Sequence, residues 1–204
     1  MIEKVRSYIK ENRLLKPDDR VIVGLSGGMD SMTLIDVLLS LGYNCMAVHC
    51  NFHLRGEESE RDAAFVEQWC ESAKVGLVSV DFDTYRYAAE HKISIEMAAR
   101  ELRYKWFEDI RKEHHADAIA VAHHRDDLAE TVLLNLIRGT GIRGLSGISP
   151  KNNSIVRPLL GISRDEIEAY VDERKLPFIF DSSNSDDAFV RNFLRLNVIP
   201  LLEK

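Results

Sequence analysis

The sequence predicts an α/β fold, a Rossmann-like three-layer sandwich in which helices cover both faces of a parallel sheet of about five strands. Short runs of β-branched and other apolar residues alternate with segments of helical periodicity along most of the chain, and this alternation is typical of βαβ units. Hydrophobic residues make up 45% of the 204 residues, which is enough for an ordinary core and argues against a disordered chain. A glycine pair stands where the first strand is expected to turn into a helix.

The predicted strands and helices follow one another in a regular order. Strands are predicted at residues 21–25, 44–50, 76–80, 118–122 and 155–158. Helices are predicted at residues 2–11, 31–41, 57–74, 94–115, 126–138 and 163–174, and residues 139–147 are predicted as a glycine-rich loop. We expect residues 1–180 to form one domain. Residues 181–204 are expected to be a linker and a first helix, 188–202, that lead toward a C-terminal domain outside this chain. Ligands of such sheets bind beyond the C-terminal ends of the strands.

Charge and cysteine content argue against several classes of protein. Lys and Arg number 27 and Asp and Glu 33, for a net charge of −6, which argues against a strongly basic protein that wraps nucleic acid. Residues 138–204 alone carry 10 basic and 9 acidic side chains, so a polyanion would bind there in preference. Cys45, Cys50 and Cys70 are too few for a disulfide-stapled secreted domain and form no Cys-x-x-Cys pair. No apolar stretch is long enough to span a bilayer, and we expect a cytoplasmic protein without membrane contact.

The sharpest local signal is the hexapeptide Ser26-Gly27-Gly28-Met29-Asp30-Ser31, between the first strand and its helix. Consecutive glycines let backbone N–H groups converge without interference from a Cβ, and a helix N-terminus favours an anion. We therefore expect this loop to bind phosphate, with both serine hydroxyls as additional donors. A Walker loop and a Gly-x-Gly-x-x-Gly fingerprint are excluded, because neither spacing is present. The simpler interpretation is a tight turn with a serine cap.

A pair of carboxylates follows the fourth predicted strand. Asp127 and Glu130 stand at i and i+3 of the next predicted helix, so both project from one face. An acidic pair beside a phosphate loop suits a cationic amine. The simpler role, favouring the helix N-terminus, is the one that we expect for Asp126. The histidine pairs, His114-His115 and His49 with His53, lack the ligand spacing of zinc sites, and surface or supporting roles are expected for them.

The hexapeptide resembles the pyrophosphate-binding loop of the PP-loop ATP pyrophosphatases, which cleave ATP between the α and β phosphates and adenylate a substrate. Further motifs are similar to those of one family among them, the tRNA(Ile)-lysidine synthetases, and the resemblance covers essentially residues 20–200. These motifs are His49-Cys50-Asn51-Phe52-His53-Leu54-Arg55, the Arg-x-x-Arg-Tyr-x-x-Phe pattern of residues 100–107, the Ala-His-His-x-x-Asp-x-x-Glu-Thr pattern of residues 122–131, the glycine-rich segment 138–147, Arg157-Pro158-Leu159-Leu160, Asp181-Ser182-Ser183-Asn184 and Arg191-Asn192-Phe193-Leu194-Arg195.

This resemblance implies an ATP-dependent ligase that joins L-lysine to the wobble cytidine of tRNA(Ile) and releases AMP and pyrophosphate. The cytosine C2 oxygen would attack the α-phosphorus of ATP, and the amine of lysine would then displace AMP from the adenylated base. The resemblance implies that residues 26–31 bind ATP, that Asp127 and Glu130 bind lysine, and that Mg²⁺ accompanies ATP and is held by Asp30. The residues with implied catalytic roles are Asp30, Arg103 and His123, and those with implied tRNA contacts are Arg138, Arg143, Arg191 and Arg195.

Three other functions stay open on the sequence. A PP-loop tRNA thiolase is disfavoured, because such relatives usually use catalytic cysteines, often in Cys-x-x-Cys pairs. An amide-forming synthetase of the NAD or GMP type would act without tRNA. A nucleotide-binding regulatory module would bind ATP without turnover. The sequence also leaves the oligomeric state open, a homodimer included.

Overall fold

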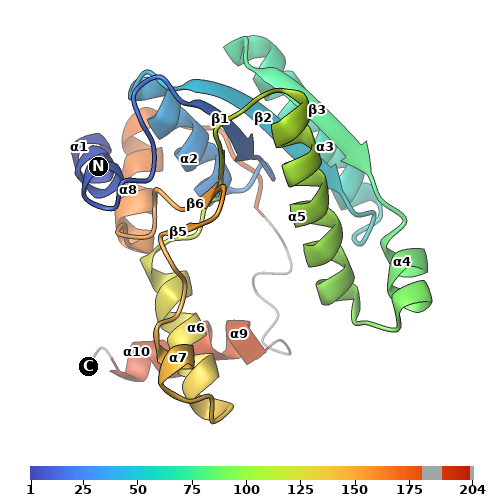
Figure 1. The fold of residues 1–204 in the computed structure, drawn as a ribbon, viewed down its shortest axis with the longest axis vertical. Helices are drawn as coiled ribbons and strands as arrows, with labels where there is room; N and C mark the ends of the chain where they lie inside the picture. The colour runs from blue at the N-terminus through green and yellow to red at the C-terminus, as the bar shows by residue number, and fades with distance from the viewer. Residues whose placement is uncertain (181–189, 203–204) are drawn as a thin grey trace.

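The computed structural model describes residues 1–180 and 190–202, and its ribbon is shown in Figure 1. Within these residues, a six-stranded sheet with the order β3-β2-β1-β4-β6-β5 forms the centre. The strands are β1 (Arg20–Gly24), β2 (Asn44–Asn51), β3 (Gly76–Asp81), β4 (Ala118–Ala120), β5 (Lys151–Asn152) and β6 (Ile155–Val156). Neighbouring strands are parallel except β5 with β6. The predicted α/β class with a largely parallel sheet is therefore confirmed.

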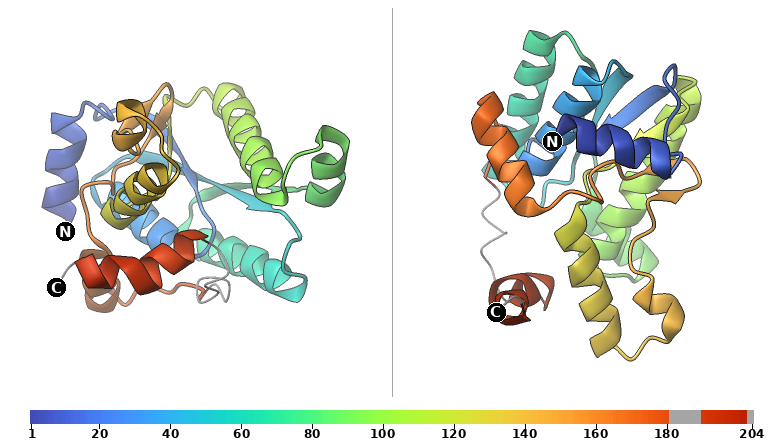
Figure 2. Two further views of the ribbon diagram at one scale, coloured as in Figure 1. Left: turned by 90° about the horizontal axis from the view of Figure 1, so that it is seen from below. Right: turned by 90° about the vertical axis from the view of Figure 1, so that its left-hand side faces the viewer.

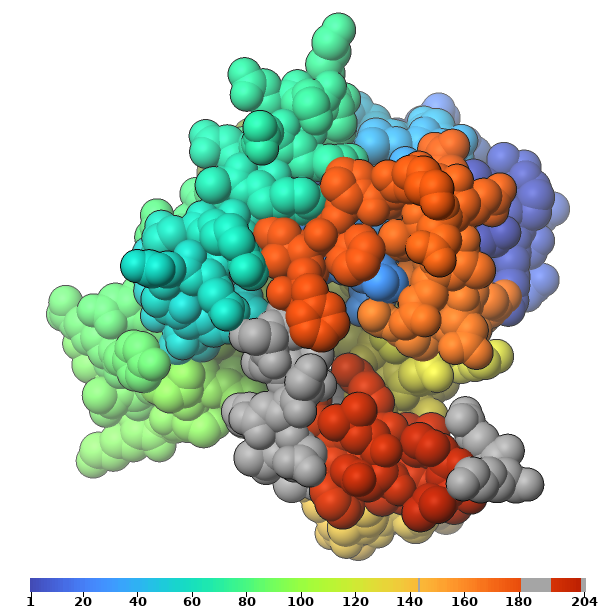
Figure 3. Space-filling model, turned by 180° about the vertical axis from the view of Figure 1, so that it is seen from behind, coloured from blue at the N-terminus to red at the C-terminus, as the bar shows by residue number. Residues whose placement is uncertain are grey.

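Helices cover both faces of this sheet, as expected. The left view of Figure 2 shows α3 and α8 on one side of the sheet and α5 on the other. The helices on the first side are α1 (Ile2–Glu11), α2 (Met29–Ser40), α3 (Glu57–Ala73) and α8 (Arg164–Arg174), and α5 spans Ile95–Glu113. The space-filling view in Figure 3 shows the orange segment that contains α8 packed against the blue and teal segments of α2 and α3.

The central strand β1 shows why the sheet needs two helical layers. Val21, Ile22 and Val23 are each 0% exposed. Val21 and Val23 belong to the core beneath α1, α2 and α8, whereas Ile22 belongs to the core beneath α5. Successive side chains of a strand point to opposite faces. An uninterrupted apolar run is therefore what a strand covered on both sides requires.

Three short elements lie where the sequence predicted none. The helix α4 (Thr84–His91) begins at Asp83, whose carboxylate accepts a hydrogen bond from the backbone N–H of Arg86. The strand β5 forms an antiparallel hairpin with β6 at the sheet edge. The single turn α7 (Ile142–Leu145) interrupts the predicted loop 139–147. These elements are too short for hydrophobic periodicity to reveal them, because a window of about 11–18 residues is needed.

The single helix predicted over residues 188–202 is wrong in detail. A π-helical stretch, η2 (Leu194–Val198), separates α9 (Val190–Phe193) from α10 (Ile199–Leu202). Pro200 has no N–H to donate to the carbonyl four residues earlier, and a π-turn is one of the ways in which a helix accommodates such a break. The predicted linker 181–187 lies outside the described residues.

The sheet topology fixes where a ligand can bind. The chain moves from β1 to β2 and β3 in one direction and to β4 and β6 in the other, so the order reverses beside β1, and ligands of such sheets bind at that point. The helix α6 (Arg125–Ile137) leaves the end of β4, and Figure 1 shows α6 and α7 below the sheet with α9 and α10 beside them. None of the helices in the described part of the chain is long and apolar enough to cross a membrane.

Candidate active site

The glycine loop follows β1 at the reversal point of the sheet. Gly27 has φ of +85°, a conformation that glycine adopts without steric cost. A Cβ on Gly27 would lie 3.1 Å from Cδ1 of Ile179 and 3.2 Å from Cδ1 of Phe65. Ile179 also donates its backbone N–H to the carbonyl of Gly27 at 2.9 Å. The loop is therefore held between α3 and the chain after α8, and glycine is required at this position.

The two serine hydroxyls form hydrogen bonds within the loop itself, which the sequence did not predict. Oγ of Ser31 donates to the carbonyl of Gly28 at 2.9 Å and accepts the backbone N–H of Ser26 at 3.1 Å, and Ser31 is buried. Oγ of Ser26 lies 3.1 Å from Oγ of Ser31 and accepts the backbone N–H of Gly28 at 3.3 Å. These bonds shape the loop, so the hydroxyls are not simply spare phosphate donors.

The backbone N–H groups at the start of α2 are better suited to an anion. Gly28 is the N-cap and has no side chain to accept the first-turn N–H groups of Met29 to Ser31, which by helix geometry also have no intrahelical acceptor. These N–H groups and the positive end of the helix dipole form the type of site that holds phosphate in other nucleotide-binding loops. The interpretation of the hexapeptide as an anion-binding loop thus fits its geometry better than a serine-capped turn, because Gly28 and not a serine caps α2.

Asp30 lies in the first turn of α2 and is already engaged by positive groups. Its Oδ1 accepts a hydrogen bond from Nη1 of Arg164 on α8 at 2.8 Å, and its Oδ2 lies 3.8 Å from Nε2 of His124. Burial raises the pKa of Asp30, and the carboxylate of Asp127 adds to this rise, while His124 and Arg164 oppose it. The carboxyl is therefore a junction between α2, α6 and α8, and its predicted roles in catalysis and metal binding stay predictions.

A buried histidine that the sequence analysis did not select lies at the centre of the acidic residues. His124 is 2% exposed. Its Nε2 lies between Oδ2 of Asp30, at 3.8 Å, and Oδ2 of Asp127, at 3.6 Å, and its Nδ1 is 3.4 Å from Oδ2 of Asp126. The motif of residues 122–131 contains both histidines, and the only sequence signal that distinguishes His124 is its place at the N-cap of α6.

The two aspartates lie in the first turn of α6, as expected, and each has a backbone partner that the sequence did not predict. Oδ2 of Asp127 accepts the backbone N–H of His124 at 3.0 Å, so Asp127 caps α6 besides facing the site. Oδ2 of Asp126, for which only a preference for the helix N-terminus was expected, accepts the backbone N–H of Arg164 at 2.8 Å. Asp126 therefore links α6 to the first turn of α8.

The predicted lysine-binding pair is confirmed as a spatial pair but already holds a cation. Glu130 is 0% exposed, and its Oε1 accepts a hydrogen bond from Nε of Arg195 at 2.6 Å. Nη2 of the same arginine lies 3.8 Å from Oδ1 of Asp127. Arg195, predicted to contact tRNA, thus bridges the two acidic residues predicted to bind lysine. Burial lowers the pKa of Arg195, but the bond to Glu130 and the nearby acidic groups more than offset this and leave it raised.

The other predicted catalytic residues, Arg103 and His123, lie near the ends of the two strands that neighbour β1. Arg103, on α5, places its guanidinium carbon 5.1 Å from the ring centroid of Phe52, just beyond β2. His123 follows β4 and accepts a hydrogen bond at Nδ1 from Nε of Arg157 at 3.2 Å. Arg103 therefore contacts the residue that follows β2, and His123 follows β4; these two strands are the neighbours of β1. Arg157, which is 6% exposed, is a further residue of this site. It begins the motif of residues 157–160, and no role was predicted for it.

The arginines predicted for tRNA do not form one described cluster. Arg138 is the exposed C-cap of α6, and Arg195 is paired as above. The side chains of Arg143 and Arg191 lie outside the described residues. Their predicted contacts with tRNA stay predictions.

The described side chains form no cluster of metal ligands, and the three cysteine thiols resist ionisation. Among the described side chains, no group of three or more His, Cys, Asp or Glu residues is arranged to hold a metal ion. Burial raises the pKa of Cys45 and of Cys50 to about 12 and that of Cys70 to about 11. These thiols are therefore poor sources of the thiolate that a cysteine nucleophile needs.

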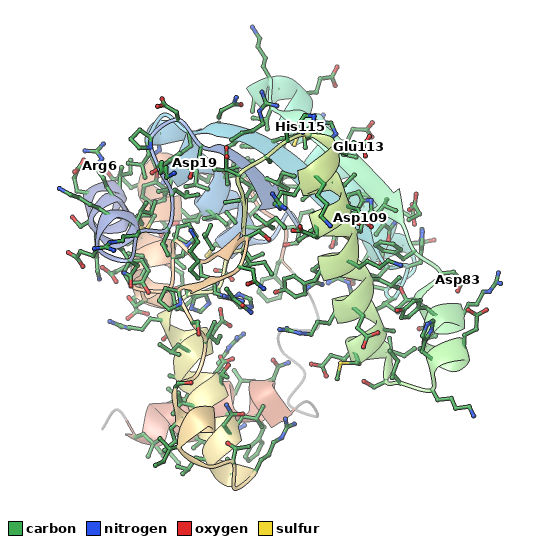
Figure 4. All side chains as sticks on the ribbon, viewed as in Figure 1. Arg6, Asp19, Asp83, Asp109, Glu113 and His115 are labelled. Atoms are coloured by element: carbon green, nitrogen blue, oxygen red, sulfur yellow. The ribbon has the colours of Figure 1, made fainter. Side chains whose placement is uncertain are left out.

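His115, expected at the surface, is exposed at the end of α5 (Figure 4), on the side of the sheet where β4 begins and not where it ends.

Comparison with known proteins places the chain in a family. The sequence model of the PP-loop domain matches residues 1–202. The chain belongs to the PP-loop domain family. This membership implies that the chain uses ATP.

Its relatives include two tRNA(Ile)-lysidine synthases. That of Parabacteroides distasonis is 59% identical over 204 residues, which are 100% of this chain and 47% of the relative. That of Bacteroides thetaiotaomicron is 55% identical over 202 residues, which are 99% of this chain and 47% of the relative. The PP-loop domain described here thus spans about half the length of the curated relatives it matches.

Solved structures confirm the fold of the PP-loop domain. The U34-tRNA thiolase NcsA from Methanococcus maripaludis superposes with a TM-score of 0.77 at 23% identity, over 98% of this chain and 72% of that one. The NH3-dependent NAD synthetase from Campylobacter jejuni superposes with a TM-score of 0.59 at 16% identity, over 98% of this chain and 88% of that one. At these identities the likeness shows the fold alone.

Proposed function

We propose that this PP-loop domain is the catalytic part of an ATP-dependent ligase that joins L-lysine to the wobble cytidine of tRNA(Ile). Its similarity to the named synthases supports this proposal. The single structural observation that carries it is the pair formed by the buried Glu130 and the partly buried Asp127, which binds a cationic side chain of the chain itself. Neither a thiolase nor an adenylating enzyme that uses ammonia needs such an acidic pair for a long cationic amine.

In the proposed reaction, the loop stabilises the departing pyrophosphate. The C2 oxygen of cytidine attacks the α-phosphorus of ATP, and the bond between the α-phosphorus and pyrophosphate breaks. The first-turn N–H groups of α2 then stabilise the negative charge of the departing pyrophosphate. Arg103 has the permanent charge and bidentate guanidinium that suit phosphate oxygens. Its contact with the Phe52 ring orients it at the end of β2.

In the second half of the proposed reaction, the lysine amine replaces AMP. The ammonium group first loses a proton to solvent, and the free amine nitrogen forms a bond to C2 of the adenylated base. The C2–O bond then breaks, AMP leaves with the electrons of that bond, and the nitrogen loses a second proton to solvent. Asp127 and Glu130 bind the positive charge of lysine. A neutral side chain of similar length would leave these carboxylates without a cation, so the acidic pair selects against it. Positioning two reactants in this way supplies much of the rate enhancement that such a ligation needs.

Mg²⁺ fits this site only as a companion of ATP. Magnesium commonly binds through one or two protein carboxylates together with substrate phosphates. The carboxylate of Asp30 belongs to the loop and would be the protein ligand of this ion, but it also accepts a hydrogen bond from Arg164. When bound, the ion would neutralise phosphate charge.

The proposal is tested by following two products in one reaction. The 204-residue chain is incubated with ATP, labelled L-lysine and a tRNA(Ile) transcript that carries cytidine at the wobble position. Labelled lysine should enter acid-insoluble tRNA in step with AMP. AMP formation that needs ammonia but no tRNA would indicate an amide-forming synthetase, and ATP binding without AMP would indicate a regulatory module; either result would overturn the proposal.

Two variants test the assigned lysine site. Asp127→Ala and Glu130→Ala should each raise the KM for lysine by at least tenfold and change the KM for ATP far less. Asp126→Ala is the matched control, because its carboxylate contacts His124 and the backbone of α8 but not Arg195. If the KM for ATP rose instead, the acidic pair would belong to the nucleotide site.

A further inference from the structure

Arg157 donates a hydrogen bond to the imidazole of His123, and this bond limits the protonation state of the ring. Arg157 directly follows β6 and His123 follows β4, and these strands are paired neighbours. Arg157 is 6% exposed, and its guanidinium donates hydrogen bonds to two different partners. Its Nη1 donates to the carbonyl of Ser149 at 2.8 Å, and its Nε donates to Nδ1 of His123 at 3.2 Å.

The chemistry of the two groups decides where the proton of the imidazole lies. A guanidinium has N–H donors and no acceptor, so Nδ1 of His123 must offer its lone pair to form this bond. An imidazolium has no lone pair on either nitrogen. The bond therefore requires a neutral ring with its proton on Nε2. A second proton would also place two positive charges in contact at a buried site, which is unfavourable.

We propose that Arg157 is a positioning residue that fixes His123 as the neutral tautomer protonated at Nε2. In this state His123 donates a hydrogen bond through Nε2 and cannot accept a proton there. The tautomer follows from the Arg157 contact alone. Its use in catalysis rests on the proposed function: the Nε2–H would stabilise an oxygen of the reacting phosphate, and His123 would not be the base that deprotonates lysine.

The surroundings of Arg157 do not require the contact with His123. The carbonyl of Ser149 and the hydroxyl of Tyr104 already hydrogen-bond the guanidinium. Burial lowers the pKa of Arg157, Tyr104 raises it, and Arg100 lowers it, yet an arginine stays charged in proteins. A purely structural Arg157 would therefore be held as well with any tautomer of the nearby ring.

Nitrogen NMR of the histidine rings tests the tautomer without reference to activity. In the 204-residue chain labelled with ¹⁵N-histidine, long-range proton–nitrogen spectra at pH 7.5 identify which ring nitrogen carries the proton, and His123→Gln assigns the signals. We expect an unprotonated Nδ1 and a protonated Nε2 for His123. A protonated Nδ1 or a ring protonated at both nitrogens would overturn the proposal, and this measurement needs no variant of Arg157.

Variants then separate positioning from structure. Arg157→Met should give His123 a mixture of tautomers and lower kcat by about tenfold or more, with both KM values within about threefold. Arg100→Met removes a neighbouring cation without touching His123 and should leave the tautomer unchanged. His123→Gln, whose amide N–H replaces Nε2–H, should retain more activity than His123→Ala, which should lose on the order of 10²-fold in kcat.

Two outcomes of these variants would contradict the proposal. An unchanged tautomer in a folded Arg157→Met variant would assign Arg157 a structural role only. Equal losses in His123→Gln and His123→Ala would show that an N–H donor at this position does not support the reaction. If the wild-type chain forms no lysidine, the proposed function fails, whereas the tautomer stands or falls by the NMR result.

Discussion

Replacing Arg195 with alanine should expose the cation-binding character of the acidic pair. In the wild-type chain the guanidinium lies 2.6 Å from Oε1 of Glu130, a residue with no exposed surface. Removing one partner of a buried ion pair costs about 3–5 kcal/mol, because the remaining charge is left uncompensated. The side chain of Arg195 is itself 36% exposed, so water can reach part of the gap and a loss of about 3 kcal/mol is expected.

L-lysine should restore much of this loss if the pair is its binding site. A ligand that binds only the folded state stabilises it by about 2.7 kcal/mol at one hundred times its Kd. For a chain of this size, 1 kcal/mol shifts Tm by about 2–4 °C. The Arg195→Ala variant should therefore melt about 6–12 °C below wild type and recover most of that difference with L-lysine.

Thermal unfolding with matched ligands is the assay. L-norleucine has the stem of lysine without the ammonium group and should not restore stability. Wild type should respond less than the variant at low lysine concentration, because Arg195 competes for the same carboxylates. In a double-mutant cycle, Arg195→Ala should cost much less in a Glu130→Gln background. Equal responses to lysine and norleucine, or no loss of stability on removing Arg195, would refute the assignment of this pair as the lysine site.

Three further predictions test the loop, a distant ion pair and the thiols. Gly27→Ala should abolish ATP binding measured by calorimetry, since the residue needs φ of +85° and meets Ile179, whereas Gly42→Ala, at φ of +87° with open space around it, should pay only the backbone strain of about 1–2 kcal/mol. Arg111 holds the pKa of Glu108 at about 2, below its usual 4.5, so this carboxylate stabilises the fold above pH 4.5 and its contribution is lost as the pH falls toward 2. Glu108→Gln should therefore lower the free energy of unfolding by about 1 kcal/mol at pH 7 and flatten its decline in acid, as urea titrations would show. Native Cys50, with a pKa of about 12, should react with iodoacetamide at pH 8 far more slowly than the unfolded chain, because its thiolate fraction is on the order of 10³ below that of a free cysteine.

The fold was predictable where local signals and tertiary packing agree. The run Val21–Val23 satisfies both strand propensity and burial on two faces, and the alternation of such runs with helical periods leads to a parallel sheet. The sequence could not give the hairpin of β5 with β6, because two-residue strands carry no periodic pattern. It also missed the π-turn before Pro200, since propensities alone do not distinguish a proline that ends a helix from one that a helix accommodates.

The site was predictable in its residue types but not in its pairings. The spacing of Asp127 and Glu130 places them on one face of α6, and the structure bears this out through their shared contact with Arg195. That contact spans 65 positions of the chain, and no local pattern reports such a pairing. The burial of His124 among acidic groups depends likewise on how α2 meets α6. Side-chain partners across elements are therefore what the structure adds.

The pairing of Glu130 with Arg195 bears on how the chain is divided. A boundary after residue 180 separates the glycine loop and α6 from the residues that carry Arg195. Yet Ile179 is bonded to Gly27, and Arg195 contacts the acidic pair. Both segments that flank residues 181–189 thus contact the same site, one at the phosphate loop and the other at the carboxylates. A chain ending at residue 180 would keep the loop but lack Arg195, which donates a hydrogen bond to Glu130. It should therefore bind ATP and be less stable than the 204-residue chain, with L-lysine restoring part of the difference, and thermal unfolding of the shortened chain would measure this directly.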